Sequence, residues 1–205
     1  MKYIKMLGLL AVAAGALMAF AGSASATEVT SEGKLYTGVI KATAGETTLH
    51  GIKTITCKKS TVEGAVETHG SSVTASGKIT HLKFEECGTD HVTVLKPGTL
   101  TVHTEYKTVV DANETHTWVC CEPNNGNGTL TSSGAEITIQ VTSLGISCIF
   151  TTNETDIGRV TGGTTAKLDI DSSSIPRTGH SIFCGGSGEW TGSYTVNTPD
   201  NLTID

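Results

Sequence analysis

The chain has 205 residues, of which 37% are apolar, 5% aromatic and 17% charged, and its formal net charge is -6. Both the apolar and the charged shares lie below the ~45–50% and ~25% of an average globular protein, so the composition indicates a polar folded chain rather than a highly charged disordered one. Because nucleic-acid binding needs clustered lysines and arginines, the negative charge argues against a nucleic-acid partner.

The first 26 residues have the pattern of a secretory signal peptide. Lys2 and Lys5 form a positive start, residues 7–20 are an apolar stretch, and Ala24-Ser25-Ala26 is a small-residue cleavage site. No later stretch approaches the ~20 apolar residues of a membrane span. We therefore expect cleavage after Ala26 and a mature chain without a transmembrane segment, secreted or held at the cell surface. Cleavage removes two lysines and no acid, which changes the net charge from -6 to -8.

The mature chain is rich in threonine, which favours strands, and in glycine, which favours turns. Short alternating apolar runs are separated by turn signals such as Pro97-Gly98 and Ser133-Gly134. The runs are residues 35–40, 52–57, 78–84, 91–95, 100–106, 136–141, 146–150, 166–170 and 190–196. No convincing helical periodicity occurs. The sequence predicts an all-β chain that forms an antiparallel β-sandwich or a barrel-like sheet.

Six cysteines in an exported chain indicate disulfide bonds. Cys57 and Cys87 each follow a predicted strand in residues 27–110, and Cys148 and Cys184 repeat this arrangement in residues 129–205. We expect the bridges Cys57–Cys87 and Cys148–Cys184, one in each of two similar halves of one compact unit. The alternative is a chance similarity between two threonine-rich stretches.

Residues 111–128 connect the two predicted halves and contain Cys120 and Cys121. The run from Pro123 to Gly128 is rich in asparagine and glycine, which is typical of a loop. If the other four cysteines pair as expected, Cys120 and Cys121 bond to each other or remain thiols. Alternatively, each half pairs with one of them.

Histidines and cysteines raise the question of a metal site. The seven histidines are His50, His69, His81, His91, His103, His116 and His180. They form no tightly spaced pair of the kind found in metal sites. His91 and His103 flank the predicted hairpin turn at residues 96–99, and the turn length decides whether they share a face. His116 with Cys120 and Cys121 offers soft ligands, but oxidised cysteines cannot bind a metal as thiolates. We expect surface imidazoles and no metal.

Acidic pairs are the other candidates for chemistry. Asp169 and Asp171 share one face of a predicted strand, where they could act as acid and base or face solvent. Asp111, Asn113 and Glu114 could line a calcium loop, although the chain has no EF-hand spacing. No catalytic, phosphate-binding or dinucleotide motif occurs. The sequence therefore favours a protein that is not an enzyme and carries no cofactor.

Trp190 and Tyr194 share one face of the last predicted strand, with Gly192 between them. The two rings could form a shelf on which a sugar ring stacks. The alternative is that both rings are buried, because the mature chain has few aromatic residues to fill its core.

Four stretches carry a resemblance to known proteins: residues 92–100, 128–136, 175–179 and 184–196, the last ending in Gly-Glu-Trp-Thr-Gly-Ser-Tyr-Thr-Val. They resemble an uncharacterised family of secreted β-rich bacterial proteins. In architecture and composition the chain is more distantly similar to PraB, a secreted activator of alkane oxidation. The resemblance implies an extracellular or surface-associated role and transfers no catalytic residue. Cys120-Cys121 is a departure from both groups.

These observations favour a secreted, non-enzymatic structural or interaction protein of the cell surface or extracellular matrix. Self-association is one expected partnership, because residues 27–34 precede the first confident strand and could add to the sheet edge of a neighbouring copy. The alternative is a carbohydrate- or surface-binding module that uses Trp190 and Tyr194 on a surface polysaccharide. A secreted hydrolase with a scattered acid pair is the third reading.

Overall fold

A computed structural model describes residues 27–67, 74–110, 119–179 and 182–205. These residues form sixteen strands and two short 3-10 helices, η1 (Thr142–Leu144) and η2 (Ile182–Cys184). The strands are β1 (Val29–Ser31), β2 (Lys34–Leu35), β3 (Val39–Ala44), β4 (Thr47–His50), β5 (Thr54–Cys57), β6 (Lys59–Val66), β7 (Ala75–Glu85), β8 (His91–Lys96), β9 (Thr99–Val110), β10 (Val119–Ser133), β11 (Glu136–Val141), β12 (Ile146–Thr151), β13 (Thr155–Thr161), β14 (Lys167–Pro176), β15 (Ser187–Thr198) and β16 (Thr203–Ile204). Within the described residues, no helix has the length and apolarity needed to cross a membrane.

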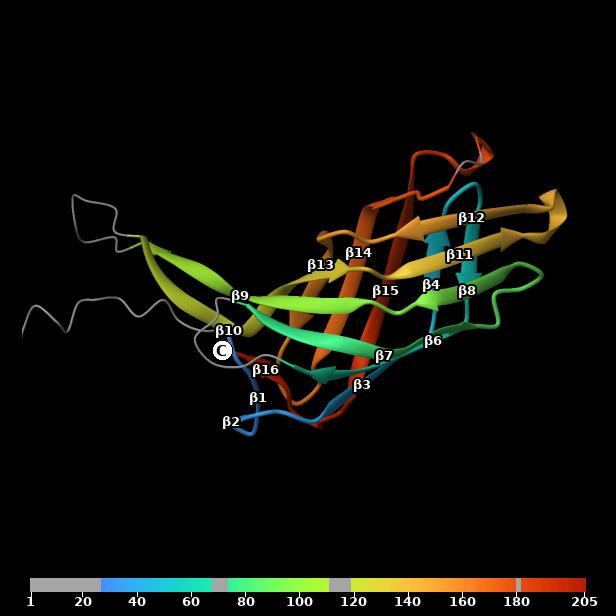
Figure 1. The fold of residues 1–205 in the computed structure, drawn as a ribbon. Coiled ribbons are helices and arrows are strands. Elements are labelled where there is room, and N and C mark those ends of the chain that lie inside the picture. Colours follow the sequence, from blue (N-terminus) through green and yellow to red (C-terminus); the bar gives the residue numbers. More distant parts are fainter. Residues whose placement is uncertain (1–26, 68–73, 111–118, 180–181) are drawn as a thin grey trace, which may run out of the picture.

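Eight strands close into an antiparallel barrel in the order β14-β13-β10-β9-β7-β6-β3-β15 (Figure 1). The barrel closes because β15 pairs with β14, from Lys167 opposite Thr195 to Pro176 opposite Ser187. Closure pairs the edges of the sheet with each other. The prediction of an all-β antiparallel fold is thus confirmed.

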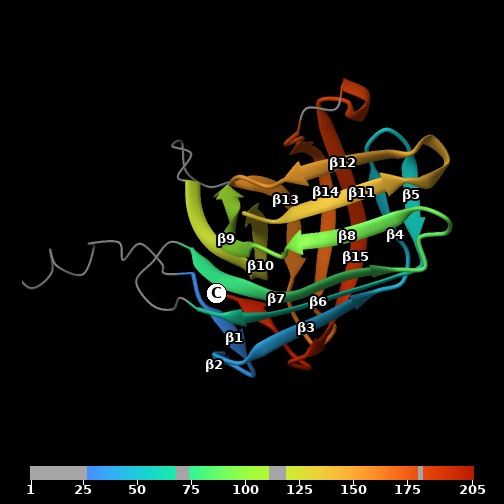
Figure 2. The same cartoon turned by 45° about the vertical axis from the view of Figure 1, so that its right-hand side comes forward.

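The barrel continues at one end as a sandwich. The first part of β15 extends past β3 and pairs with β4, which in turn pairs with β5. A second sheet, β12-β11-β8, lies across these strands (Figure 2). Phe150 and Ile139 of this sheet line a small space together with Leu49 of β4 and Trp190 of β15. The buried residues of barrel and sandwich form one continuous hydrophobic core.

Two parts of the chain have the same strand connections. In the first part β3 pairs with β6, β4 with β5, and β6 with β7. In the second part β10 pairs with β13, β11 with β12, and β13 with β14. The strands that follow also correspond, because β9 pairs with β7 and β10 just as β15 pairs with β14 and β3. The barrel is therefore built from two copies of one four-strand pattern.

Two disulfide bonds sit at corresponding places in these two parts. Cys57 of β5 is bonded to Cys87, which follows β7, and Cys148 of β12 is bonded to Cys184, which follows β14. Both predicted bridges are therefore confirmed. Each ties the second strand of a sandwich hairpin to the segment that leaves a long barrel strand.

The predicted hairpin around Pro97-Gly98 is not formed, because β8 and β9 belong to different sheets. At Gly98 the backbone has a φ of 76°, and a Cβ there would lie 2.5 Å from the Ala135 nitrogen. The turn is thus pressed against the chain where β10 passes into β11. Its role is to move the chain from the second sheet to the barrel.

Part of the predicted connecting loop is a strand. Residues 119–128 belong to β10, which pairs with β9 from Val119 opposite Val110 onward. The ladder is irregular between Pro123 and Gly128, so the Asn/Gly run interrupts the pairing without ending the strand. The long partner strand β9 supplies backbone partners on both sides of the interruption. Residues 111–118 lie outside the described part of the chain.

The segment at residues 27–34 is not free to join a neighbouring copy, so that expectation is wrong. Val29 in β1 pairs with Ile204 in β16, and β1 also pairs with β2. Thr27 is only 1% exposed, and its Oγ1 accepts hydrogen bonds from the nitrogen and the hydroxyl of Thr104, at 3.2 and 2.9 Å. The segment is therefore folded onto its own barrel, where β1, β2 and β16 form a small end sheet.

Candidate functional site

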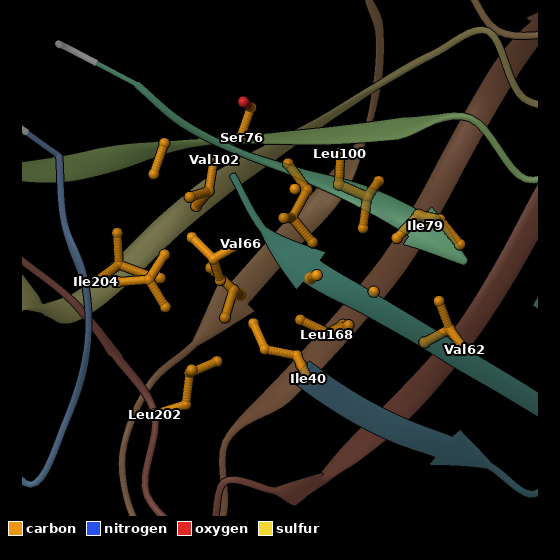
Figure 3. Close-up of a pocket in the computed structure, with 17 residues that line it drawn as sticks. Ile40, Val62, Val66, Ser76, Ile79, Leu100, Val102, Leu168, Leu202 and Ile204 are labelled. Atoms are coloured by element: carbon orange, nitrogen blue, oxygen red, sulfur yellow. The ribbon is translucent and has the colours of Figure 1, made fainter. Parts of the chain in front are cut away.

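The barrel contains an apolar cavity of about 80 Å³ next to the end sheet (Figure 3). Seventeen of the described residues line it, and among these Ser76 alone has a polar side chain. Figure 3 shows the Ser76 hydroxyl turned away from the other labelled side chains. The lining residues are Val29, Ile40, Val62, Gly64, Ala65, Val66, Ala75, Ser76, Gly77, Ile79, Leu100, Val102, Leu130, Val160, Leu168, Leu202 and Ile204. The cavity wall is therefore aliphatic.

The cavity stays open where small residues on β6 and β7 leave space between larger aliphatic side chains. Strands β6 and β7 contribute Gly64, Ala75 and Gly77 to the wall. A Cβ at Gly64 would lie 2.9 Å from the Lys78 carbonyl oxygen, so the two strands are close together at this glycine. The opposite strands contribute larger side chains, such as Leu130 and Leu168. In an eight-stranded barrel, such differences decide whether the interior is filled or holds a small ligand.

The end sheet forms one wall of the cavity and is hydrogen-bonded to one side of the barrel. Val29, Leu202 and Ile204 line the cavity and are almost fully buried. Besides the bonds between Thr27 and Thr104, the nitrogen of Gly163 donates to the carbonyl oxygen of Leu202 at 2.7 Å. These bonds connect the end sheet to β9 and to the segment between β13 and β14. Ile40 and Val66, on β3 and β6, are only partly buried.

Aromatic rings close the inner end of the barrel. A small void of about 20 Å³ shares Val62, Ile79, Leu100 and Leu168 with the cavity and is also lined by Trp190 and Tyr194. The Trp190 ring meets the rings of Phe84 and Tyr194 edge-to-face, with centroids 5.7 and 6.0 Å apart. Such edge contacts are a favourable aromatic geometry. The rings therefore separate the barrel cavity from the sandwich.

A buried hydrogen-bond chain fixes Tyr194. Its hydroxyl donates to Ser60 Oγ at 2.8 Å, and Ser60 Oγ donates to the carbonyl oxygen of Lys83 at 2.9 Å. Burial raises the pKa of Tyr194 far above its ordinary value, so the ring stays neutral. Strands β15, β6 and β7 are thereby linked inside the core.

The sugar-stacking shelf expected from Trp190 and Tyr194 is not present at the surface. The two side chains are 7% and 1% exposed and point into the core. The residue between them, Gly192, is pressed against Thr47, because a Cβ there would lie 2.7 Å from Thr47 Cγ2. With so few aromatic residues, the fold uses these rings to fill its interior, which was the alternative interpretation.

The acidic pair lies on the outer face of the barrel. Asp169 and Asp171 are exposed on β14, as their spacing predicts, and Asp169 pairs across strands with Arg159. Ser193 Oγ donates a hydrogen bond to Asp169. In the described parts of the chain, no three His, Cys, Asp or Glu side chains are grouped so that they could hold a metal ion. The two acids face a polar surface groove on β10, β13 and β14.

The candidate metal ligands from the sequence are scattered or undescribed. His91 pairs with Gln140 in the second sheet, whereas His103 lies on β9 opposite Thr129 in the barrel. His50 contacts Thr54 Oγ1 through Nδ1 at 2.8 Å, and His81 is exposed on β7. The remaining candidates fall outside the described residues, namely His69, His116, His180, Asp111, Asn113 and Glu114. The backbone of Cys120 and Cys121 lies in β10 opposite Val109 and Thr108, and their side chains are outside what the structure describes.

Sequence reasoning missed the cavity. The alternation of apolar residues marks strands, but Val39 and Ile40 are both aliphatic, so the pattern does not tell which one faces inward. The paired small residues of β6 and β7 were a usable signal, since glycine inside a strand indicates a close backbone approach. No protein-family model matches the chain, and neither a curated protein nor a solved structure matches it. The interpretation of the cavity therefore depends on its own geometry.

Proposed function

We propose that this protein is exported and acts outside the cell or at its surface as a non-enzymatic interaction protein, by holding a small apolar group inside its barrel. The observation that carries the proposal is the aliphatic cavity. Small-molecule sites are concave and mostly apolar, and a dry apolar cavity gains free energy when a fitting apolar ligand replaces empty space.

The chemistry of the wall supports binding rather than bond-making. Valine, leucine, isoleucine, alanine and glycine side chains can neither donate a proton nor attack a substrate. Export is supported by the signal-peptide pattern and by the two disulfide bonds, which persist in oxidising compartments. The burial of Trp190 and Tyr194 disfavours the alternative of a polysaccharide-binding module based on those rings.

The test is a binding titration of the purified mature protein with xenon, benzene and octanoate, in which binding is measured by calorimetry or NMR. Binding of at least one probe at millimolar concentration or below supports the proposal. Val102→Phe fills the cavity and should abolish binding, whereas Thr101→Phe places the same ring on the other face of β9 and should not. If none of the three probes binds to the unaltered protein, the proposal is wrong.

A further inference from the structure

We infer that the group held in the cavity is an unbranched alkyl chain, and that it passes into the barrel between Ile40 and Val66. This inference deepens the proposed function and rests on it. It is carried by three features of the described residues: the chemistry of the wall, the path of the space toward the aromatic rings, and the position of the half-buried rim.

The chemistry of the wall favours an alkyl chain over an aromatic ring or a sugar. Among the described residues, no aromatic side chain lines the cavity, so a planar ligand would find no ring to stack on. A sugar would leave its hydroxyls without partners against an aliphatic wall. A polymethylene chain is narrow and needs no hydrogen-bond partner.

The cavity leads from the end sheet toward the aromatic rings of the core. It begins at the end sheet and continues, past the shared residues Val62, Ile79 and Leu168, toward the void in front of Trp190 and Tyr194. A linear ligand can follow this path with its methyl end toward the rings. Its polar end, if it has one, stays at the mouth, because no described side chain inside could accept it.

The mouth lies on the side of the cavity formed by β3 and β6, where lining side chains are only partly buried. The end sheet is hydrogen-bonded to Thr104 of β9 and to Gly163. Toward β3, the nitrogen of Tyr36 donates to the Val29 carbonyl oxygen and its hydroxyl to the Val39 carbonyl oxygen, both at 2.8 Å. On β3 and β6, Ile40 pairs with Gly64 and Val39 with Ala65, so Ile40 and Val66 are diagonal neighbours. Both line the cavity (Figure 3), and both are only partly buried, as are Val62 and Leu100.

The first experiment compares chain with ring at constant carbon number and charge. Heptanoate and cyclohexanecarboxylate are titrated into the exported protein, followed by hexanoate, octanoate and decanoate. We expect heptanoate to bind at least tenfold more tightly than the ring. Affinity should rise about fourfold for each added methylene, which corresponds to about 0.8 kcal/mol, and level off once the cavity is full. Equal or tighter binding of cyclohexanecarboxylate overturns the chain inference and leaves the proposed function intact.

The second experiment tests the mouth with a matched pair of variants. Ile40→Trp narrows the mouth, whereas Val39→Trp places the same side chain on the outer face, where Val39 is 43% exposed. We expect Ile40→Trp to slow octanoate association at least tenfold and Val39→Trp to leave it unchanged. Val66→Phe at the same rim replaces Ile40→Trp if that variant does not fold. Unchanged association in the folded rim variants overturns the position of the mouth.

A third measurement separates a free molecule from a lipid chain as the source of the alkyl group. The protein is centrifuged with phosphatidylcholine vesicles, with and without saturating octanoate. Co-sedimentation that octanoate abolishes indicates a lipid chain in the cavity. Octanoate binding without co-sedimentation indicates free amphiphiles. Failure of xenon, benzene and all the linear probes to bind overturns the proposed function and this inference together.

Discussion

Gly64 and Gly158 hold equivalent positions in the two halves of the barrel. Each pairs with two large aliphatic residues on the neighbouring strands, Gly64 with Ile40 and Ile79, and Gly158 with Leu130 and Ile170. The strand pairing shifts register beside each glycine. In β6 the shift lies between Glu63 and Gly64, and in β10 it lies just after Leu130, the residue opposite Gly158. Glycines at such irregularities let a strand bend and approach its neighbour closely, which closing a barrel requires.

The two glycines should differ in how much they tolerate a methyl group. Gly158 has a φ of 139°, and a Cβ there would overlap the carbonyl oxygen of Asp169. Gly158→Ala should lower the free energy of unfolding by about 2 kcal/mol or more. Gly64→Ala should cost less, about 1 kcal/mol, because its φ is not in the left-handed region and its Cβ would lie 2.9 Å from the Lys78 carbonyl oxygen, a milder contact than the overlap at Gly158. Gly45→Ala, which meets open space, is the control. Urea unfolding measures all three, and equal stability of the Gly158 and Gly45 variants contradicts the argument.

Local features of the sequence predicted several of the strands, such as β9 and β15, and the two disulfide bonds, because alternation and cysteine spacing are visible within about forty residues. Strands β6, β10 and β13 were not among the predicted runs. Closure of the barrel was not predictable in this way, since β3 pairs with β15, with Thr43 opposite Thr195, and no local pattern encodes a contact between residues so far apart in the chain. The shared face of Trp190 and Tyr194 was predicted correctly. That this face points inward depends on the register of β15 between β14 and β4, which only the assembled sheet determines.

The disulfide Cys148–Cys184 should stabilise the sandwich more than the barrel. It closes a separation of 36 residues between β12 and η2, and bridges of this span contribute about 3–4 kcal/mol in the loop-entropy model. We expect the double variant Cys148→Ala/Cys184→Ala to unfold at lower denaturant concentration. Amide exchange should speed up most in β12 and least in β3. If amide exchange instead speeds up equally in β12 and β3, the sandwich and the barrel unfold as one unit and the expectation is wrong.

Protonation of Asp90 should make the protein less stable in acid, because it weakens the interactions of this carboxylate. Its carboxylate is 5% exposed, accepts a hydrogen bond from Lys53 Nζ at 2.8 Å, and accepts another from the Thr142 nitrogen at 3.0 Å. The Lys53 bond, aided by the Thr142 bond, holds the pKa of Asp90 below its ordinary value of 3.8. This stabilising contribution is therefore complete above the ordinary pKa and is lost as the pH falls through the lowered one.

We expect Asp90→Asn to be less stable than the unaltered protein at pH 7, with the difference narrowing below pH 4. Glu86→Gln is the control, because Glu86 and Lys58 are 3.9 Å apart and mostly exposed, and such pairs contribute little. Thermal unfolding at pH 7, 5 and 3 measures the effect. A stability difference for Asp90→Asn that stays constant over this range would contradict the assignment.

We predict that the protein is exported and that its mature form begins at Thr27. Its buried hydroxyl accepts hydrogen bonds from Thr104, so cleavage after Ala26 leaves a residue that is already fixed against the barrel. Intact-mass analysis of secreted material tests the cleavage, and a retained Met1 would rule out export by this route.

Thr104→Val removes the hydroxyl that donates to Thr27 and should lower the free energy of unfolding by about 1 kcal/mol.

The hydrogen bond between Tyr194 and Ser60 should show strong coupling in a double-mutant cycle. Ser60→Ala leaves the buried Tyr194 hydroxyl without its acceptor, which should cost about 1–3 kcal/mol. Tyr194→Phe leaves Ser60 still bonded to the Lys83 carbonyl and should cost about 1 kcal/mol. The double variant should be more stable than the sum of the two losses predicts, because the unpaired hydroxyl is gone. Urea unfolding of the four proteins gives the coupling free energy, and strict additivity would show that the two hydroxyls act independently.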